Sequence, residues 1–271
     1  MAGCIPLHFP IVIAAIKCML SSPFNLHGLH ATTMGATPCV VVNGPQSLTL
    51  NSSHGALGSG TRGNATIGRA LKLVLLNVGG GVLGGSESTT LGSPMKFTMC
   101  VAENEAKCAT SGWEPLHVTR GFQLEETVVT LIPVTSGPVQ IVDFFARDAD
   151  TLIALIADSL SSAYSRDMPL INDVTVVIPP EHIDTLVKGG IRSKEEMALR
   201  LFNACNSNLA ASYGAIVRNK VVVDNKVPAM AAPLLGAVLG GTLGVVQWLV
   251  TAGEASERRK ESSKEGATGE E

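Results

Sequence analysis

Runs of apolar residues alternate along this chain with loops rich in glycine, serine and asparagine. The run at 9–20 has the length of a buried helix of about three turns, and Pro10 falls in its first turn, where proline is tolerated. Residues 38–42 form a short, continuously apolar stretch, which predicts a buried strand. A long polar loop follows. An amphipathic pattern over 65–78, whose first turn begins at Asn64, predicts a helix that three glycines terminate.

The rest of the chain continues this alternation of helices and strands. Strands are predicted at 96–102, 128–134, 139–144 and 174–178. Helices are predicted at 151–160 and from Ser193, which forms a capping box with Glu196, to about residue 205. Hydrophobic strands alternating with helices are typical of crossover units. We therefore expect an α/β fold, with a largely parallel sheet and helices on both of its faces.

The order helix–strand–loop–helix occurs twice, which predicts two diverged halves. The first half would occupy 1–126 and the second 127–226, followed by a hydrophobic segment at 227–253 and a charged, disordered tail at 254–271. If the halves are equivalent, the strands at 40–42 and 176–178 should be neighbours in the centre of one sheet. The alternative is a chance similarity between amphipathic helices.

Composition narrows the classes of function. The net charge of −3 at pH 7 and the lack of a basic stripe exclude nucleic acid as an expected partner. Six cysteines without a CxxC pair, in a chain of 271 residues, indicate reduced thiols and an intracellular protein. Residues 227–253 carry no charge and are long enough to span a bilayer, so a membrane anchor and a buried segment are the two alternatives there.

Polar side chains concentrate after the predicted strands and before the helix at 65–78. In an α/β sheet the carboxyl ends of the strands form the ligand crevice, so we expect these side chains to meet there. Glu103 follows the strand at 96–102 and is a candidate for proton transfer together with His54 and His117; a structural carboxylate bonded to a loop is the alternative for Glu103. The residues expected to bind the substrate are His27, His30, Asn43, Arg62, Asn64, Thr66 and His182.

An anionic group of the substrate is expected at the start of the helix at 65–78. Free N–H groups of Ala65 and Thr66 would bind it, and Arg62 would supply the counter-charge. The glycines before this helix match neither the P-loop nor the dinucleotide-binding fingerprint, so no cofactor can be named. His27 and His30 could face one side of a turn, but no familiar spacing of metal ligands is present and no metal is predicted.

Several stretches resemble a family of α/β proteins, common in bacteria, that is associated with small thiol- or selenol-bearing partner proteins of the UGSC type. The resemblance covers residues 2 to about 205. In the first half it rests on AGCIPLHFPIVIAAIKCML, FNLHGLHATT, VVNGP, GNATIGRALKLVLLNVGG, KFTMCVAENE and WEPLHVTRGF, and more loosely in the second on VVIPPEHIDTL and SKEEMALRLF. Relative to that family the chain is short at its N-terminus and diverges after about residue 226.

Two functional classes stay open at this stage. The first is an enzyme acting on a small molecule, by redox chemistry shared with a thiol or selenol partner or by lyase or hydrolase chemistry, within a biosynthetic pathway. The second is a non-catalytic scaffold or membrane-tethered subunit that keeps the fold.

Overall fold

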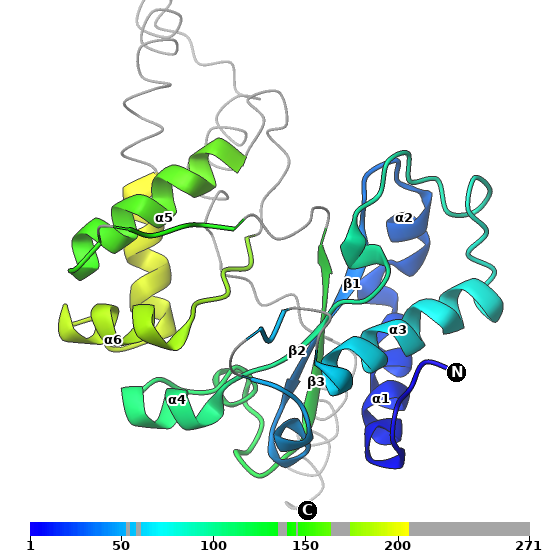
Figure 1. Cartoon of the computed structure of the whole chain (residues 1–271), viewed down its shortest axis with the longest axis horizontal. Coiled ribbons are helices and arrows are strands. Elements are labelled where there is room, and N and C mark those ends of the chain that lie inside the picture. Colours follow the sequence, from blue (N-terminus) through cyan, green and yellow to red (C-terminus); the bar gives the residue numbers. More distant parts are fainter. Residues whose placement is uncertain (53–54, 58–60, 135–139, 145, 164–173, 206–271) are drawn as a thin grey trace, which may run out of the picture. The chain divides into compact units, whose positions relative to one another are not determined.

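A computed structural model of the chain describes residues 1–52, 55–57, 61–134, 140–144, 146–163 and 174–205 (Figure 1). These residues form two compact units. One contains the described residues of Met1–Ala106 and Pro115–Pro138, and the other those of Lys107–Glu114 and Val139–Trp248. The division predicted at residue 126 therefore falls inside the first unit.

The first unit is built on a three-stranded mixed sheet with the order β2-β1-β3 (Figure 1). The central strand, β1 (Thr37–Asn43), is parallel to β2 (Cys100–Ala102), with Val40 opposite Cys100. It is antiparallel to β3 (Val128–Val134) over seven residue pairs. Because β1 is paired on both edges and covered on both faces, its continuously apolar sequence is explained.

Alternate side chains of β1 enter two different cores, as the period of a strand requires. Val40 and Val42 face α1 (Phe9–Met19) and α3 (Arg62–Asn77), which cover one face of the sheet and contribute Ile11 and Ile67 (Figure 1). On the other face, Val41 and its neighbours pack with loop side chains. This second core consists of Cys39, Val41, Val101 and Ile132, with Ala56, Met99, Leu116 and Val134 partly buried beside it.

Short elements complete this part of the chain. The helices are α2 (Leu26–Ala31) and α4 (Glu105–Ser111). The 3-10 turns are Pro6–His8 (η1), Ser22–Phe24 (η2), Pro45–Thr49 (η3), Pro94–Lys96 (η4) and Val118–Arg120 (η5).

The second unit is helical in its described residues. It contains α5 (Ala149–Ala163), α6 (Pro180–Lys188) and a helix over 194–205. Their shared core includes Leu152, Ile156, Leu186, Ile191 and Leu201. One half of the predicted capping box is confirmed, because the Glu196 N–H donates to Ser193 Oγ at 3.1 Å. In the other half, the Glu196 carboxylate accepts a hydrogen bond from the Arg192 N–H, one residue before the expected Ser193 N–H.

The structure confirms the α/β class, the first helix and the strands at 38–42 and 128–134. One of the two described strand pairings is parallel and the other antiparallel, so a largely parallel sheet stays unconfirmed. The expectation that 40–42 and 176–178 are neighbouring strands is wrong. Both edges of β1 are occupied by β2 and β3, and 174–178 forms no strand.

Several predicted loops and strands differ for local reasons. The loop at 24–35 contains α2, because Asn25 adopts a left-handed conformation and its side chain caps the helix at Gly28 N–H. The strand at 96–102 shortens to three residues, because a 3-10 turn ends at Lys96. Residues 140–144 form no strand.

The segments at 227–253 and 254–271 lie outside the described residues. Within the described ones, no single helix combines the length and the apolar composition that crossing a bilayer requires; the pair Pro6–Met19 and Ser22–Ala31 does so only jointly, across a 75° bend.

Candidate functional site: two carboxylates at the ends of β1 and β2

The candidate site lies where the two parallel strands of the first unit end. β1 ends at Asn43 and β2 at Ala102, and parallel strands bring their carboxyl ends to one edge of the sheet. The Glu103 N–H continues the ladder by donating to the Val42 carbonyl at 3.2 Å. Glu105 then begins α4. Strand register therefore places the Asn43 amide and the Glu103 carboxylate at one end of the sheet, and the start of α4 brings Glu105 beside them.

The side chain of Asn43 joins the two carboxylates. Asn43 is fully buried, and its Nδ2 donates to Glu103 Oε2 at 2.7 Å and to Glu105 Oε1 at 3.0 Å. Because one nitrogen serves both acceptors, the two carboxylates are held within a few ångströms of each other. A single buried amide thus sets the geometry of the pair.

Backbone N–H groups donate further hydrogen bonds to both carboxylates. The Gly44 N–H donates to Glu105 Oε1 at 2.6 Å, and the Leu116 N–H donates to Glu103 Oε2 at 2.6 Å. Gly44 has a φ of 81°, and a Cβ there would run into the carbonyl oxygen of Glu126, so only glycine fits. All four of these bonds come from uncharged donors.

His117 lies behind Glu105. It is fully buried, and its Nδ1 is 3.7 Å from Glu105 Oε1, which is longer than a hydrogen bond. Its Nε2 is 3.4 Å from the Leu124 carbonyl oxygen, whereas its Nδ1 has no hydrogen-bond partner among the described residues.

Glu105 is a member of the group that a ligand can reach, because its side chain is partly exposed. Its side chain is 21% exposed, and its Oε2 accepts no hydrogen bond from the described part of the chain, whereas Oε1 accepts two. The arrangement therefore presents one oriented, open carboxylate oxygen at the sheet edge, where it could accept a proton from a bound molecule.

Three of the predicted site residues, Asn43, Glu103 and His117, meet here. Glu105 and Gly44 were missing from the predicted set. The signal that could have identified Glu105 is its spacing of two residues from Glu103 at the start of a helix, where acidic residues are favoured. His54 lies outside the described residues.

His27 and His30 lie elsewhere, on α2. His30 is buried, and its carbonyl accepts the Ser88 N–H at 2.9 Å. Both histidines line an open depression of about 420 Å³ with Asn25 and Ser22. The expectation that they share the crevice at the strand ends is wrong. Helix α2 comes before the first residue of β1, whereas the candidate site lies after its last residue.

The residues predicted at the helix start have structural partners. Asn64 Nδ2 donates to the carbonyls of Asn51 and Ala56, both at 2.8 Å, and Thr66 Oγ1 donates to the Gly63 carbonyl at 3.3 Å. Helix α3 begins two residues earlier than predicted, at Arg62. The Ala65 N–H therefore bonds to the Thr61 carbonyl at 2.9 Å, so the expectation of a free N–H there is wrong.

His182 is in the second unit. It lies on α6 rather than in a loop, and its Nε2 is 3.4 Å from Asp143 Oδ2. The predicted strand end before it does not form, which removes the reason for placing His182 in a crevice.

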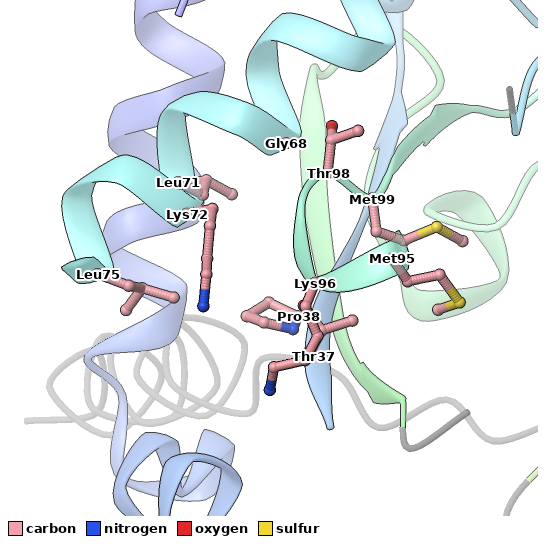
Figure 2. A pocket seen from close by; sticks show the side chains of 10 residues that line it. All are labelled: Thr37, Pro38, Gly68, Leu71, Lys72, Leu75, Met95, Lys96, Thr98 and Met99. Atoms are coloured by element: carbon pink, nitrogen blue, oxygen red, sulfur yellow. The ribbon is translucent and has the colours of Figure 1, made fainter. Parts of the chain in front are cut away.

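A second cluster of charges lies at the opposite end of β1. Glu87, which is 1% exposed, accepts Lys72 Nζ at 2.6 Å and lies 2.8 Å from Lys96 Nζ. Lys96 also donates to the Ala36 carbonyl at 2.7 Å, directly before β1. Figure 2 shows both lysines beside a small cavity between α3 and the start of β1. Its volume of about 10 Å³ leaves room for no more than a water molecule.

The pKa of Glu87 follows from these contacts. Burial on its own would raise it, but the hydrogen bonds and charges of Lys72 and Lys96 together outweigh burial and hold the pKa below its ordinary value. Glu87 is therefore an ionised carboxylate paired with two lysines, and we assign it a structural role.

Across the described ranges, no three His, Cys, Asp or Glu side chains are grouped so that they could hold a metal ion.

Comparisons of the chain with models of protein families, with curated proteins and with solved structures find no match. The resemblance inferred from the sequence motifs therefore stays a prediction.

Proposed function

We propose that this chain is an enzyme that acts on a small molecule by proton transfer, with Glu105 as the acid–base group. The observation that carries the proposal is the open Oε2 of a carboxylate whose Oε1 is fixed by the Gly44 N–H and the Asn43 amide. A general base needs a positioned lone pair within reach of the substrate, and this geometry supplies one.

The neighbours of Glu105 support this role. Asn43 and Glu103 act as positioning residues, because the amide that orients Glu105 is itself held by Glu103. The buried ring of His117 packs behind the carboxylate, with its Nδ1 3.7 Å from Oε1. The two carboxylates also leave negative charge at the sheet edge, which suits a substrate that carries an acidic C–H or O–H group rather than an anionic group at that point.

Lyase or hydrolase chemistry is the chemistry that a positioned carboxylate supports directly. Burial raises the pKa of the Cys39 thiol to about 12 and that of Cys100 further still, so neither thiol forms an appreciable thiolate at neutral pH. A thiol or selenol partner, a biosynthetic pathway, an intracellular location and a membrane anchor at 227–253 remain sequence-based predictions. The proposal depends neither on a largely parallel sheet nor on two diverged halves.

The test is proton exchange in D₂O. We would incubate the full chain with a panel of small 2-oxo and 3-hydroxy acids, esters and amides and follow deuterium incorporation and product formation by NMR. For any compound that the wild type converts, we expect Glu105→Gln to lower the rate by about a hundredfold or more.

Glu125→Gln is the matched control, because Glu125 is exposed and has the same charge. It should leave the rate unchanged. Full activity in Glu105→Gln would contradict the proposal. A chain that converts no member of the panel, and that unfolds when Glu105 is replaced, would favour the scaffold alternative.

A further inference from the structure

The first turn of α3 carries positive charge that no acidic residue of the same turn balances. The N–H groups of Arg62, Gly63 and Asn64 donate to no residue in the part of the chain that is described, and Thr61 provides no side-chain cap. The turn contains no acidic residue. A helix of 16 residues concentrates about half a positive charge at such an end, so this one is suited to an anion.

His8 gives an independent indication of a ligand at the same place. It is only 2% exposed, and neither of its ring nitrogens has a hydrogen-bond partner among the described residues. Its Cε1, at the tip of the ring, lies 3.5 Å from the position that a Cβ on Gly63 would occupy. A buried imidazole without a partner is costly, so an unsatisfied ring aimed at a helix start indicates a missing partner.

The protonation of His8 matches a role as a neutral donor. Burial, and to a lesser extent the positive charge of Arg62, lower its pKa, while the Thr49 carbonyl opposes the shift without reaching hydrogen-bond geometry. A neutral imidazole keeps one N–H, which can donate to an anion without the desolvation penalty of a buried cation.

Arg62 supplies the full charge of the site. Its side chain is exposed, and its Nε donates to the Gly3 carbonyl at 3.3 Å, which holds the guanidinium near the helix start. Gly63 allows the close packing at this turn, because a Cβ there would approach the Leu50 side chain to 2.6 Å and the Thr49 carbonyl oxygen to 3.3 Å. Three N–H groups, one buried imidazole and one guanidinium thus belong to the first turn or lie beside it.

We propose that the first turn of α3 binds a tetrahedral oxyanion, the phosphate group of a small molecule. The N–H groups of Arg62, Gly63 and Asn64 form the fan of donors that phosphate groups accept at helix starts. His8 adds a donor from the buried side, and Arg62 adds a charge-assisted one from the solvent side. This site is independent of the proton-transfer role of Glu105.

The experiment measures binding of inorganic phosphate to the full chain at constant ionic strength, with chloride as the background anion. We expect saturable binding by calorimetry and shifts of the backbone amide signals of residues 62–64. Arg62→Gln should weaken phosphate binding about tenfold, because it removes a charged donor. His8→Phe should weaken it about fivefold, because it removes one neutral donor.

Arg69→Gln is the matched control. It removes the same charge from the same helix, at a position where the guanidinium stacks 4.1 Å from the centre of the Phe97 ring. It should leave phosphate affinity within twofold. Equal weakening by Arg62→Gln and Arg69→Gln, or no shift at residues 62–64, would overturn the proposal.

Acetate distinguishes the class of anion. Acetate binding as tightly as phosphate would show a general anion site and overturn the assignment to phosphate. Because Arg62 is exposed, its variant should fold whether or not His8→Phe does, and the measurement does not depend on turnover at Glu105.

Discussion

The two ends of β1 differ in the groups that bind their carboxylates. At the N-terminal end, Glu87 lies between Lys72 and Lys96, and each of its oxygens faces an ammonium group. At the C-terminal end, Glu103 and Glu105 share the neutral amide of Asn43 and are bonded by backbone N–H groups. One end has more cations than anions, and the other has two anions bonded by neutral donors.

This difference separates a structural charge from one available for chemistry. The Glu87 cluster fixes the chain before β1 to α3 and leaves space for no more than a water molecule. The Glu105 carboxylate keeps one oxygen without a described partner and partly faces solvent. Substitutions at the two ends should therefore affect stability and activity in different proportions.

The largest expected effect is that of Glu87→Gln. It leaves two mostly buried lysines without their carboxylate, and breaking a buried ion pair in this way destabilises a protein by about 3 kcal/mol or more. Urea unfolding of the full chain, followed by fluorescence, measures the change. Glu125→Gln, an exposed control, should change stability by less than about 0.5 kcal/mol. A similarly small effect of Glu87→Gln would mean that the two ends do not differ.

A smaller effect is expected from Asn43→Asp, at the other end of the strand. It replaces the amide that bridges two carboxylates with a third carboxylate at a fully buried position. Like charges at this distance should destabilise the fold by about 2 kcal/mol at pH 7, and protonation should restore stability as the pH falls. The same urea titration at pH 7 and pH 5 tests this. A deficit that does not shrink at pH 5 would show that lost hydrogen bonds, rather than repulsion, cause it.

The smallest effect expected is the acid response of Glu87. Since its pKa is lowered in the folded state, its ion pairs stabilise the protein fully above the ordinary value of 4.5, and this contribution is lost as the pH falls through the lowered pKa. The difference in unfolding free energy between the wild type and Glu87→Gln should therefore narrow below pH 4.5. A difference that stays constant down to pH 3 would contradict this assignment.

The local pattern of apolar and polar residues was sufficient to predict those elements for which it fits only one type of secondary structure. The continuously apolar β1 and the helix at 9–20 follow from period and length, and Asn43 and Glu103 were predicted at a strand end because both follow apolar strands. The antiparallel return of β3 could not be predicted in this way, because pairing direction depends on contacts about ninety residues apart in the sequence.

The Glu87 cluster was missed for a similar reason. A glutamate in a loop of glycine and serine has the pattern of an exposed residue, and only the fold brings Lys72 and Lys96 to it. His182 was misplaced because a five-residue apolar run before it was interpreted as a strand, whereas the described residues of that unit are packed as helices.

The position of β3 in the sheet also has a consequence for synthesis of the chain. Eighty-four residues separate the end of β1 at Asn43 from the start of β3 at Val128. At a rate of about 5–20 residues per second, a ribosome needs roughly 4 to 17 s to make them. During that interval the central strand of the sheet has an edge without its partner, the kind of exposed edge that recruits other chains. Aggregation during translation is therefore most to be expected between the completion of β1 and the emergence of β3.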